Sequence, residues 1–163
     1  MDTSPPTQPN ASRRPLDLAE LDAVVLRRAE LRETLTYLEH CLAAPAFGRA
    51  VVWGEAVHDA LTTLAADFAA HVDVTEGSGG LHDAILAGDV RLANAVAALT
   101  AEHAEVATEI ARLVADSAPP VVEDDVDALR ERGTRLLTAL SKHRQRGADL
   151  IYEAFEADIG GMG

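Results

Sequence analysis

The stretch LLTALSKHRQRGADLIYEAFEAD, from Leu136 to Asp158, has the pattern of a long amphipathic helix. Apolar residues with the three- and four-residue spacing of one helix face recur at Leu129, Leu136, Leu140, Leu150 and Ala154. We call such a row of positions the seam of its helix. His143 occupies the seam position after Leu140, and Gly147 occupies the next one. The stretch therefore predicts a packed helix that turns a histidine toward the protein interior.

Three earlier segments have the same periodicity, and each predicts a further helix. The first, from about Pro15 to Ala44, has the seam Leu21, Val24, Arg28, Leu31, Leu35, Leu38 and Leu42. The second, from about Trp53 to Glu76, has the seam Val57, Leu61, Leu64, Phe68, His71 and Thr75. The third, which follows an N-cap signal at Gly88–Asp89, has the seam Leu92, Val96, Leu99, His103, Val106, Ile110 and Leu113.

Helix-breaking residues separate the four segments at Pro45, at GSGG (77–80) and at Pro119–Pro120. An acidic linker, 123–125, is expected to precede a last helix that begins near Val126. Because short loops force neighbouring helices to run antiparallel, the pattern predicts an all-α, antiparallel up-down-up-down four-helix bundle. One such domain is expected over residues 15–160. Residues 1–14, rich in Pro, Ser and Thr without periodicity, are predicted to form a disordered N-terminal tail.

Composition excludes several classes of function. The formal net charge is −13, from 27 acidic and 14 basic residues, which argues against a nucleic-acid partner or an anionic membrane surface. No apolar run reaches the roughly 20 residues of a membrane span, and the N-terminus lacks the apolar core of a secretion signal. We therefore expect a soluble cytoplasmic protein. Cys41, the single cysteine, cannot form an internal disulfide and is expected to be a small buried hydrophobe.

Three histidines occupy seam positions on three different helices: His71, His103 and His143. A buried polar group without a partner costs about 1–3 kcal/mol, so three inward imidazoles need partners. One metal ion would satisfy all three, since neutral imidazole suits Zn, Fe, Ni and Cu. The heights of His71 and His103 match only if residues 77–88 continue beyond the second helix before the chain turns. The other histidines, predicted to be at the surface or its boundary, are His40, His58 and His82.

Three segments resemble the hemerythrin-like (HHE) domain: FAAHVDVTEG (68–77), LTAEHAEVATEI (99–110) and LSKHRQRGADLIYEAFEADIGG (140–161). The resemblance covers roughly residues 17–160. It implies a four-helix bundle with non-haem di-iron in its core, and a protein that binds or senses O2, NO or peroxide, or handles iron. Carried over by position, His71, His103 and His143 match histidines of the family.

The chain departs from the family pattern at its other ligand positions. Glu33 and Thr34 stand where the first-helix histidine falls. Thr75 stands at the carboxylate position four after His71, and Gly147 and Ala148 take the carboxylate positions after His143. A di-iron site needs bridging carboxylates, so these residues favour a single iron or zinc ion. The predicted metal ligands, with water completing the set, are His71, Glu76, His103 and His143.

Two alternatives for the whole chain stay open at this level. A metal-free bundle could act as an interaction or regulatory module with its histidines joined by hydrogen bonds, and haem could lie between two histidines. Gly147 also has two explanations, because glycine inside a helix costs about 1 kcal/mol relative to alanine. It either leaves space beside His143 for a ligand or allows a close helix contact, as Gly133 could. Glycine-rich nucleotide loops and nucleophile motifs are missing from the sequence.

Overall fold

The computed structural model describes residues 18–156, and every regular element in that range is helical. The elements are α1 (Leu18–Ala43), α2 (Ala50–Glu76), the short α3 (Leu81–Gly88), the 3₁₀ turn η1 (Val90–Leu92), α4 (Ala93–Asp116) and α5 (Glu123–Glu156). The predicted all-α class is therefore confirmed for the described residues. The predicted N-terminal tail, residues 1–14, and the last two residues of the predicted final helix lie outside them.

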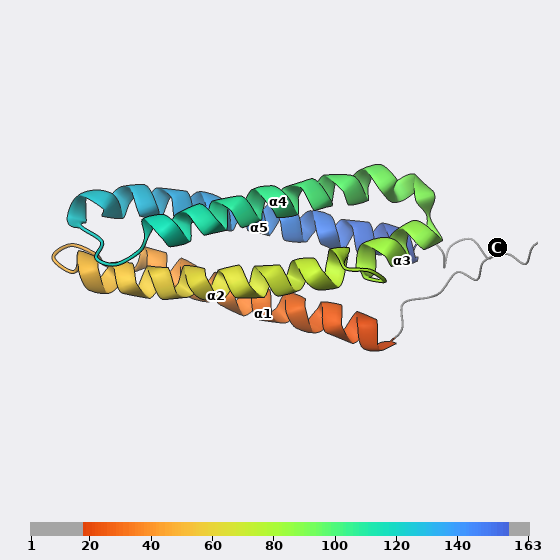
Figure 1. Ribbon diagram of the computed structural model, residues 1–163, viewed down its shortest axis with the longest axis horizontal. Helices are drawn as coiled ribbons and strands as arrows, with labels where there is room; N and C mark the ends of the chain where they lie inside the picture. Colours follow the sequence, from red (N-terminus) through yellow and green to blue (C-terminus); the bar gives the residue numbers. More distant parts are fainter. Residues whose placement is uncertain (1–17, 157–163) are drawn as a thin grey trace, which may run out of the picture.

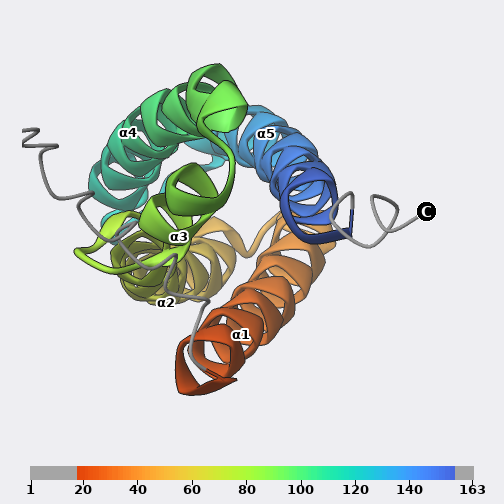
Figure 2. The same cartoon turned by 90° about the vertical axis from the view of Figure 1, so that its right-hand side faces the viewer.

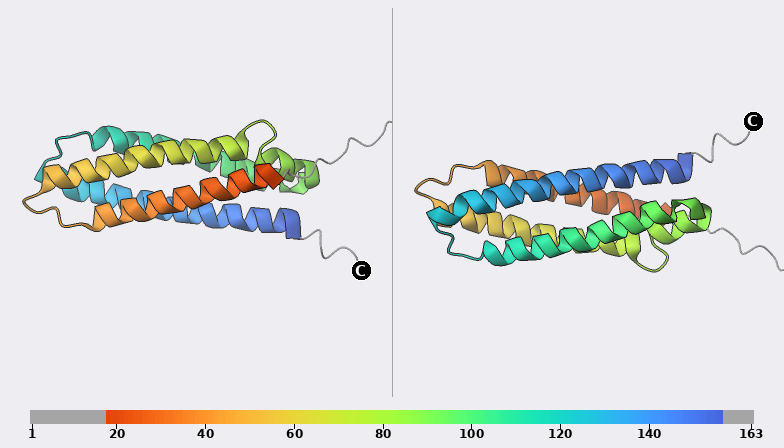
Figure 3. Two further views of the ribbon diagram at one scale, coloured as in Figure 1. Left: turned by 90° about the horizontal axis from the view of Figure 1, so that it is seen from below. Right: turned by 90° about the horizontal axis from the view of Figure 1, so that it is seen from above.

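The four long helices lie along a common axis (Figure 1). The α1–α2 and α4–α5 connections lie at the same end of the bundle, and α3 lies at the opposite end (Figures 1 and 3). Viewed along the axis, α1, α2, α4 and α5 surround a common centre, and α3 lies across its end (Figure 2). Helix α2 packs against both α1 and α4, whereas α1 and α5 contact each other less extensively. The α1–α5 side is thus the more open one.

Within residues 18–156, no single helix has both the length and the apolar composition of a membrane span. The helical stretches 50–88 and 90–116 meet these criteria only when they are taken together, and the chain bends by 114° at the break between them.

Helix α2 begins at Ala50, three residues before the predicted start near Trp53. A tight turn precedes the helix, in which the Arg49 N–H donates to the Ala46 carbonyl (2.8 Å). Gly48 has φ +69°, a left-handed conformation that glycine adopts without steric cost. No side chain caps this helix, but Ala50 and Trp53 are buried. Burial of the first turn therefore fixes a helix start that the sequence does not signal.

Helix α5 begins at Glu123, so the predicted acidic linker is in fact the first helical turn. Its three acidic residues are Glu123, Asp124 and Asp125. Negative side chains are favourable there because the N-terminal end of a helix carries a partial positive charge. The preceding helix ends at Asp116, shortly before the predicted break at Pro119–Pro120.

The hydrophobic core consists of two clusters, with the histidines between them. The larger cluster, around Leu38, Leu64 and Leu140, fills the half of the bundle near the two loops. The smaller one, around Ile85 and Leu99, lies near α3. Every predicted seam position of α2 and of the third predicted helix is buried, as is Cys41. Leu21, a predicted seam residue of α1, is instead 40% exposed. It lies near the beginning of the helix, where there are fewer neighbouring residues to cover it.

Substitution of Gly54 by alanine is expected to destabilise the fold. A Cβ on Gly54 would lie 2.5 Å from the Cβ of Val121, which is buried in the α4–α5 loop. A branched side chain cannot relieve that overlap without backbone movement, and overpacking costs about 1–3 kcal/mol. That loss exceeds the gain of about 1 kcal/mol from replacing a helical glycine. Urea unfolding should therefore give a lower midpoint for Gly54→Ala.

Gly147→Ala is the matched control for that substitution. Apart from its chain neighbours and the adjacent helix backbone, no described atom lies within 4 Å of the position its Cβ would take. The alanine should therefore raise the unfolding free energy by about 1 kcal/mol. Equal midpoints for the two variants would contradict the packing described for Gly54.

Candidate metal centre

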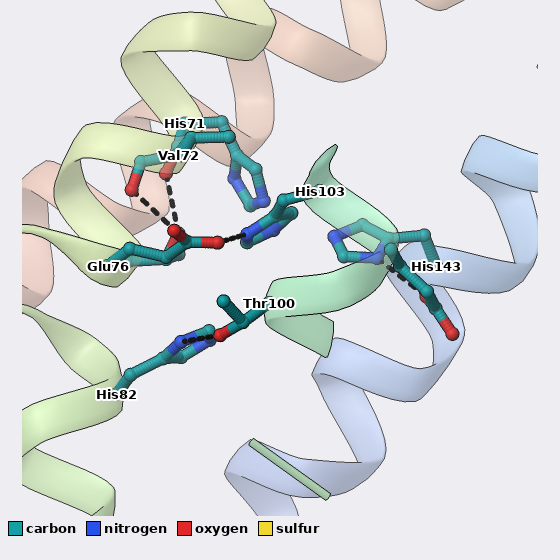
Figure 4. A network of polar contacts seen from close by, with 9 residues as sticks. His71, Val72, Glu76, His82, Thr100, His103 and His143 are labelled. Carbon is teal, nitrogen blue, oxygen red and sulfur yellow. Dashed lines mark hydrogen bonds and ion pairs between the residues drawn. The ribbon is translucent and has the colours of Figure 1, made fainter. Parts of the chain in front are cut away.

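Three helices direct one imidazole each to a common point in the core (Figure 4). His71 comes from α2, His103 from α4 and His143 from α5, and all three are buried. One potential ligand nitrogen from each lies within 4.8 Å of the other two. The ring centroids of His103 and His143 are 4.6 Å apart, and that of His71 lies 5.2 Å and 5.8 Å from them. The three residues lie close enough to hold a metal ion.

The connection between α2 and α4 places His71 and His103 at the same height. Helix α3 continues beyond the end of α2 before the chain turns back through η1 (Figure 1). Asp89 caps that turn, because its Oδ1 accepts a hydrogen bond from the Arg91 N–H (2.9 Å). The expected extension of residues 77–88 is thus observed.

Two carboxylates hold the outer nitrogens of two of these rings. Glu76 Oε1 accepts a short hydrogen bond from His103 Nδ1 (Figure 4). Glu102 Oε2 accepts one from His143 Nδ1 at 2.9 Å, and its other oxygen pairs with Arg146 Nε at 2.8 Å. Because each Nδ1 carries the shared proton, Nε2 is left as the nitrogen that can bind a metal. Carboxylates behind metal-binding histidines commonly fix the ring tautomer and orientation in this way.

His71 differs from the other two, because neither of its ring nitrogens has a hydrogen-bond partner among the described residues. Burial, and to a smaller extent the neighbouring His103, His143 and Arg28, lower its pKa to about 3. Burial also lowers the pKa of His143, against the opposing effect of the hydrogen bond that His143 donates to Glu102. At neutral pH these two imidazoles are therefore uncharged, which is the form that binds metals. A buried, uncharged imidazole that lacks a hydrogen-bond partner among the described residues is what we expect of a metal ligand.

A small cavity adjoins the three rings. Its volume is about 30 Å³, and Gly147 is part of its wall. A cavity needs about 10–15 Å³ to hold one water molecule, so this one holds very few atoms. Space remains beside Gly147, whereas a Cβ on Gly133 would lie 2.7 Å from Leu42 Cδ1. Open space therefore explains the helical glycine at position 147, and a close helix contact explains the one at position 133.

The size of the cavity argues against the haem alternative. Pockets for cofactors and drug-sized ligands typically have about 300–1,000 Å³, well above the 30 Å³ found here.

His82 was predicted to lie at the surface or its boundary, and that prediction was wrong. It is 7% exposed and stacks on His103, with centroids 5.8 Å apart and planes 4° from parallel. Its Nδ1 lies 3.3 Å from Thr100 Oγ1 (Figure 4). Burial, and then His103, lower the pKa of His82. It lines the cavity as a fourth imidazole but is not among the three clustered nitrogens.

Other residues at family ligand positions have different partners. Glu76 lies behind His103, on the side away from His143 (Figure 4), and as a direct ligand it stays a prediction. The Thr75 hydroxyl bonds to the carbonyl of His71 at 2.9 Å. Thr34 hydrogen-bonds to Asp67. Sequence reasoning also missed Glu102, since its hydrogen bond with His143 depends on how α4 and α5 are rotated against each other.

Comparisons of the chain with protein-family models, with curated proteins and with solved structures find no match.

Proposed function

We propose that the chain is a hemerythrin-like metal-binding protein that holds one non-haem iron or zinc ion at His71, His103 and His143. The proposal includes the antiparallel up-down-up-down arrangement of that family, which is supported by two interhelix loops at one end of the bundle. It rests chiefly on His71, a buried imidazole that lies beside two others and whose two ring nitrogens have no hydrogen-bond partner within residues 18–156. Leaving such a group unpaired costs about 1–3 kcal/mol, and metal coordination would remove part of that cost.

The donor set favours iron or zinc over hard ions such as calcium. Imidazole nitrogen suits Zn and Fe, whereas Ca and Mg require oxygen ligands. When bound by three protein ligands, the metal would offer an open position to a small molecule such as O2, NO or peroxide. The protein's own contribution is to orient His103 and His143 through Glu76 and Glu102, and to keep space open beside Gly147.

Elemental analysis of protein purified without added metal tests this proposal. We expect one transition-metal ion per chain in the wild type and at most a trace in His103→Ala, which lacks one ligand. His40→Ala is the matched control, because His40 is exposed on α1 and should leave the metal content unchanged. A wild type that stays metal-free after incubation with Fe(II) or Zn(II) would favour the alternative, a metal-free interaction module.

Neutralising either supporting carboxylate should weaken metal binding without removing a ligand. Glu76→Gln and Glu102→Gln are each expected to lower the metal affinity by about 10–100-fold, the usual effect of losing an outer-shell partner. Competition with a chromophoric chelator measures this. Glu105→Gln, an exposed carboxylate on the same helix as Glu102, should retain wild-type affinity. Unchanged affinity in both test variants would contradict the role given to the two carboxylates.

A further inference from the structure

Three arginines gather at one side of the histidine cavity in a protein whose net charge is −13. Arg28 and Arg32 belong to α1 and Arg144 to α5, on the more open side of the bundle. Arg28 Nη2 lies 3.5 Å from the Arg144 carbonyl oxygen, its one hydrogen bond within the described residues. None of the three forms an ion pair with a carboxylate of residues 18–156. No carboxylate of the described residues therefore lies within ion-pairing distance of these three guanidinium groups.

The electrostatics of Arg28 agree with this arrangement. Burial lowers its pKa, and the nearby Arg144 and Arg32 lower it further. An arginine nevertheless stays protonated in proteins. The cluster thus holds a partly buried positive charge that lacks a counter-ion in the described part of the chain.

The wall of the cavity contains no carboxylate among the residues that the structure describes. Its polar lining consists of four imidazoles, one hydroxyl and two guanidinium groups, from His71, His82, His103, His143, Thr75, Arg28 and Arg144. Glu76 and Glu102 lie behind their histidines and are not part of the wall. A divalent ion held by three imidazoles, which contribute no negative charge, would keep its double positive charge toward this space. In a poorly solvated site, such a charge strongly favours an anionic neighbour.

The approach to the cavity is also positive. A groove of about 500 Å³ runs between α1 and α5, and Arg144 lines both this groove and the cavity. Arg32 and Arg130 line the groove as well, and Glu39 is the one acidic residue in its described wall. Positive charge concentrated along a groove raises the local concentration of anions.

We propose that the exogenous ligand of this site is a small monoanion, bound at the open metal position and hydrogen-bonded by Arg28. The inference rests on the proposed metal function and narrows its ligand class. The 30 Å³ cavity limits the ligand to a few heavy atoms, and the space beside Gly147 accommodates it. Arg28 selects for charge, because a guanidinium donates charge-assisted hydrogen bonds that a neutral diatomic molecule cannot match.

The test uses Co(II)-loaded full-length protein and azide as the small-anion probe. Co(II) binding is first measured by its visible absorption, and azide is then titrated into the complex. The wild type should give a saturable spectral change. Arg28→Gln should still bind Co(II), and its Co(II) complex should bind azide about 10–100-fold more weakly, as for loss of a hydrogen bond to a charged group. Arg112→Gln, an exposed arginine on α4, is the matched control and should behave as wild type.

Several outcomes separate the two proposals. Failure to bind Co(II) would overturn both the metal function and this inference. Co(II) binding with a spectrum insensitive to azide, or equal azide affinity in Arg28→Gln and wild type, would overturn this inference alone. Benzoate serves as an oversized anion, and binding as tight as that of azide would contradict the size limit. If Arg28→Gln does not fold, Arg144→Gln takes its place, with a several-fold loss of azide affinity expected.

Discussion

Zinc added to the metal-free protein is expected to raise its melting temperature, and a chelator is expected to reverse the rise. A ligand that binds only the folded state stabilises it by about 4 kcal/mol at about 1,000 times its dissociation constant. For a domain of this size, about 4 kcal/mol corresponds to a Tm shift of about 8–16 °C. The three ligands come from α2, α4 and α5, so the bound ion would join helices that separate on unfolding. Thermal melts followed by circular dichroism measure the shift.

Two controls make the shift specific to the histidine site. Mg²⁺ at the same concentration should not change the Tm, because it requires oxygen ligands and the cluster offers imidazole nitrogens. His103→Ala should lose most of the zinc-dependent shift, whereas His40→Ala should keep it. A wild-type Tm that is the same in zinc and in chelator would favour a metal-free bundle with an interaction role.

The periodicity of the sequence predicts the three clustered histidines because helical spacing determines which side chains face the interior. His71 follows Phe68 on one seam, and His103 follows Leu99 on another, so both must be buried if the helices pack at all. The same reasoning places His143. Their convergence at one height needed the additional observation that α3 continues beyond α2.

The partners of those histidines could not be predicted in the same way. Glu76 and Glu102 lie beside their seams. Glu76 was predicted as a metal ligand and not as the partner of His103, and Glu102 was not predicted. Whether such a carboxylate reaches an imidazole on another helix depends on the rotation of the two helices about their axes, which one sequence does not specify. His82 was missed for a related reason, since α3 is too short to have a clear periodicity of its own.

The helix starts at Ala50 and Glu123 were mispredicted because local signals and tertiary packing disagree there. Helix α2 has no capping side chain, and its first turn is fixed by the burial of Trp53. The acidic run before Val126 has the composition of a linker, but the same charges favour a helix N-terminus. The first and last residues of a helix depend on such contacts, whereas the face that the helix buries does not.

His71→Leu is expected to have opposite effects on stability with and without metal. In chelator, leucine replaces a buried imidazole that has no hydrogen-bond partner among the described residues, so the variant should be more stable than wild type by about 1–3 kcal/mol. In zinc, the variant has lost a ligand and should fall below the metal-loaded wild type. Urea unfolding in the two buffers measures both differences.

His103→Leu is the matched comparison, and it distinguishes a metal ligand from a structural histidine. His103 already has a partner, and its removal leaves the half-buried Glu76 carboxylate without the hydrogen bond that it accepts. This variant should therefore be less stable than wild type in both buffers. If His71 instead had a structural role, His71→Leu would also destabilise the protein in chelator, because leucine would remove a favourable interaction. If His71→Leu, unlike His103→Leu, raises the unfolding free energy in chelator and lowers it in zinc, then His71 is a metal ligand and not a structural histidine.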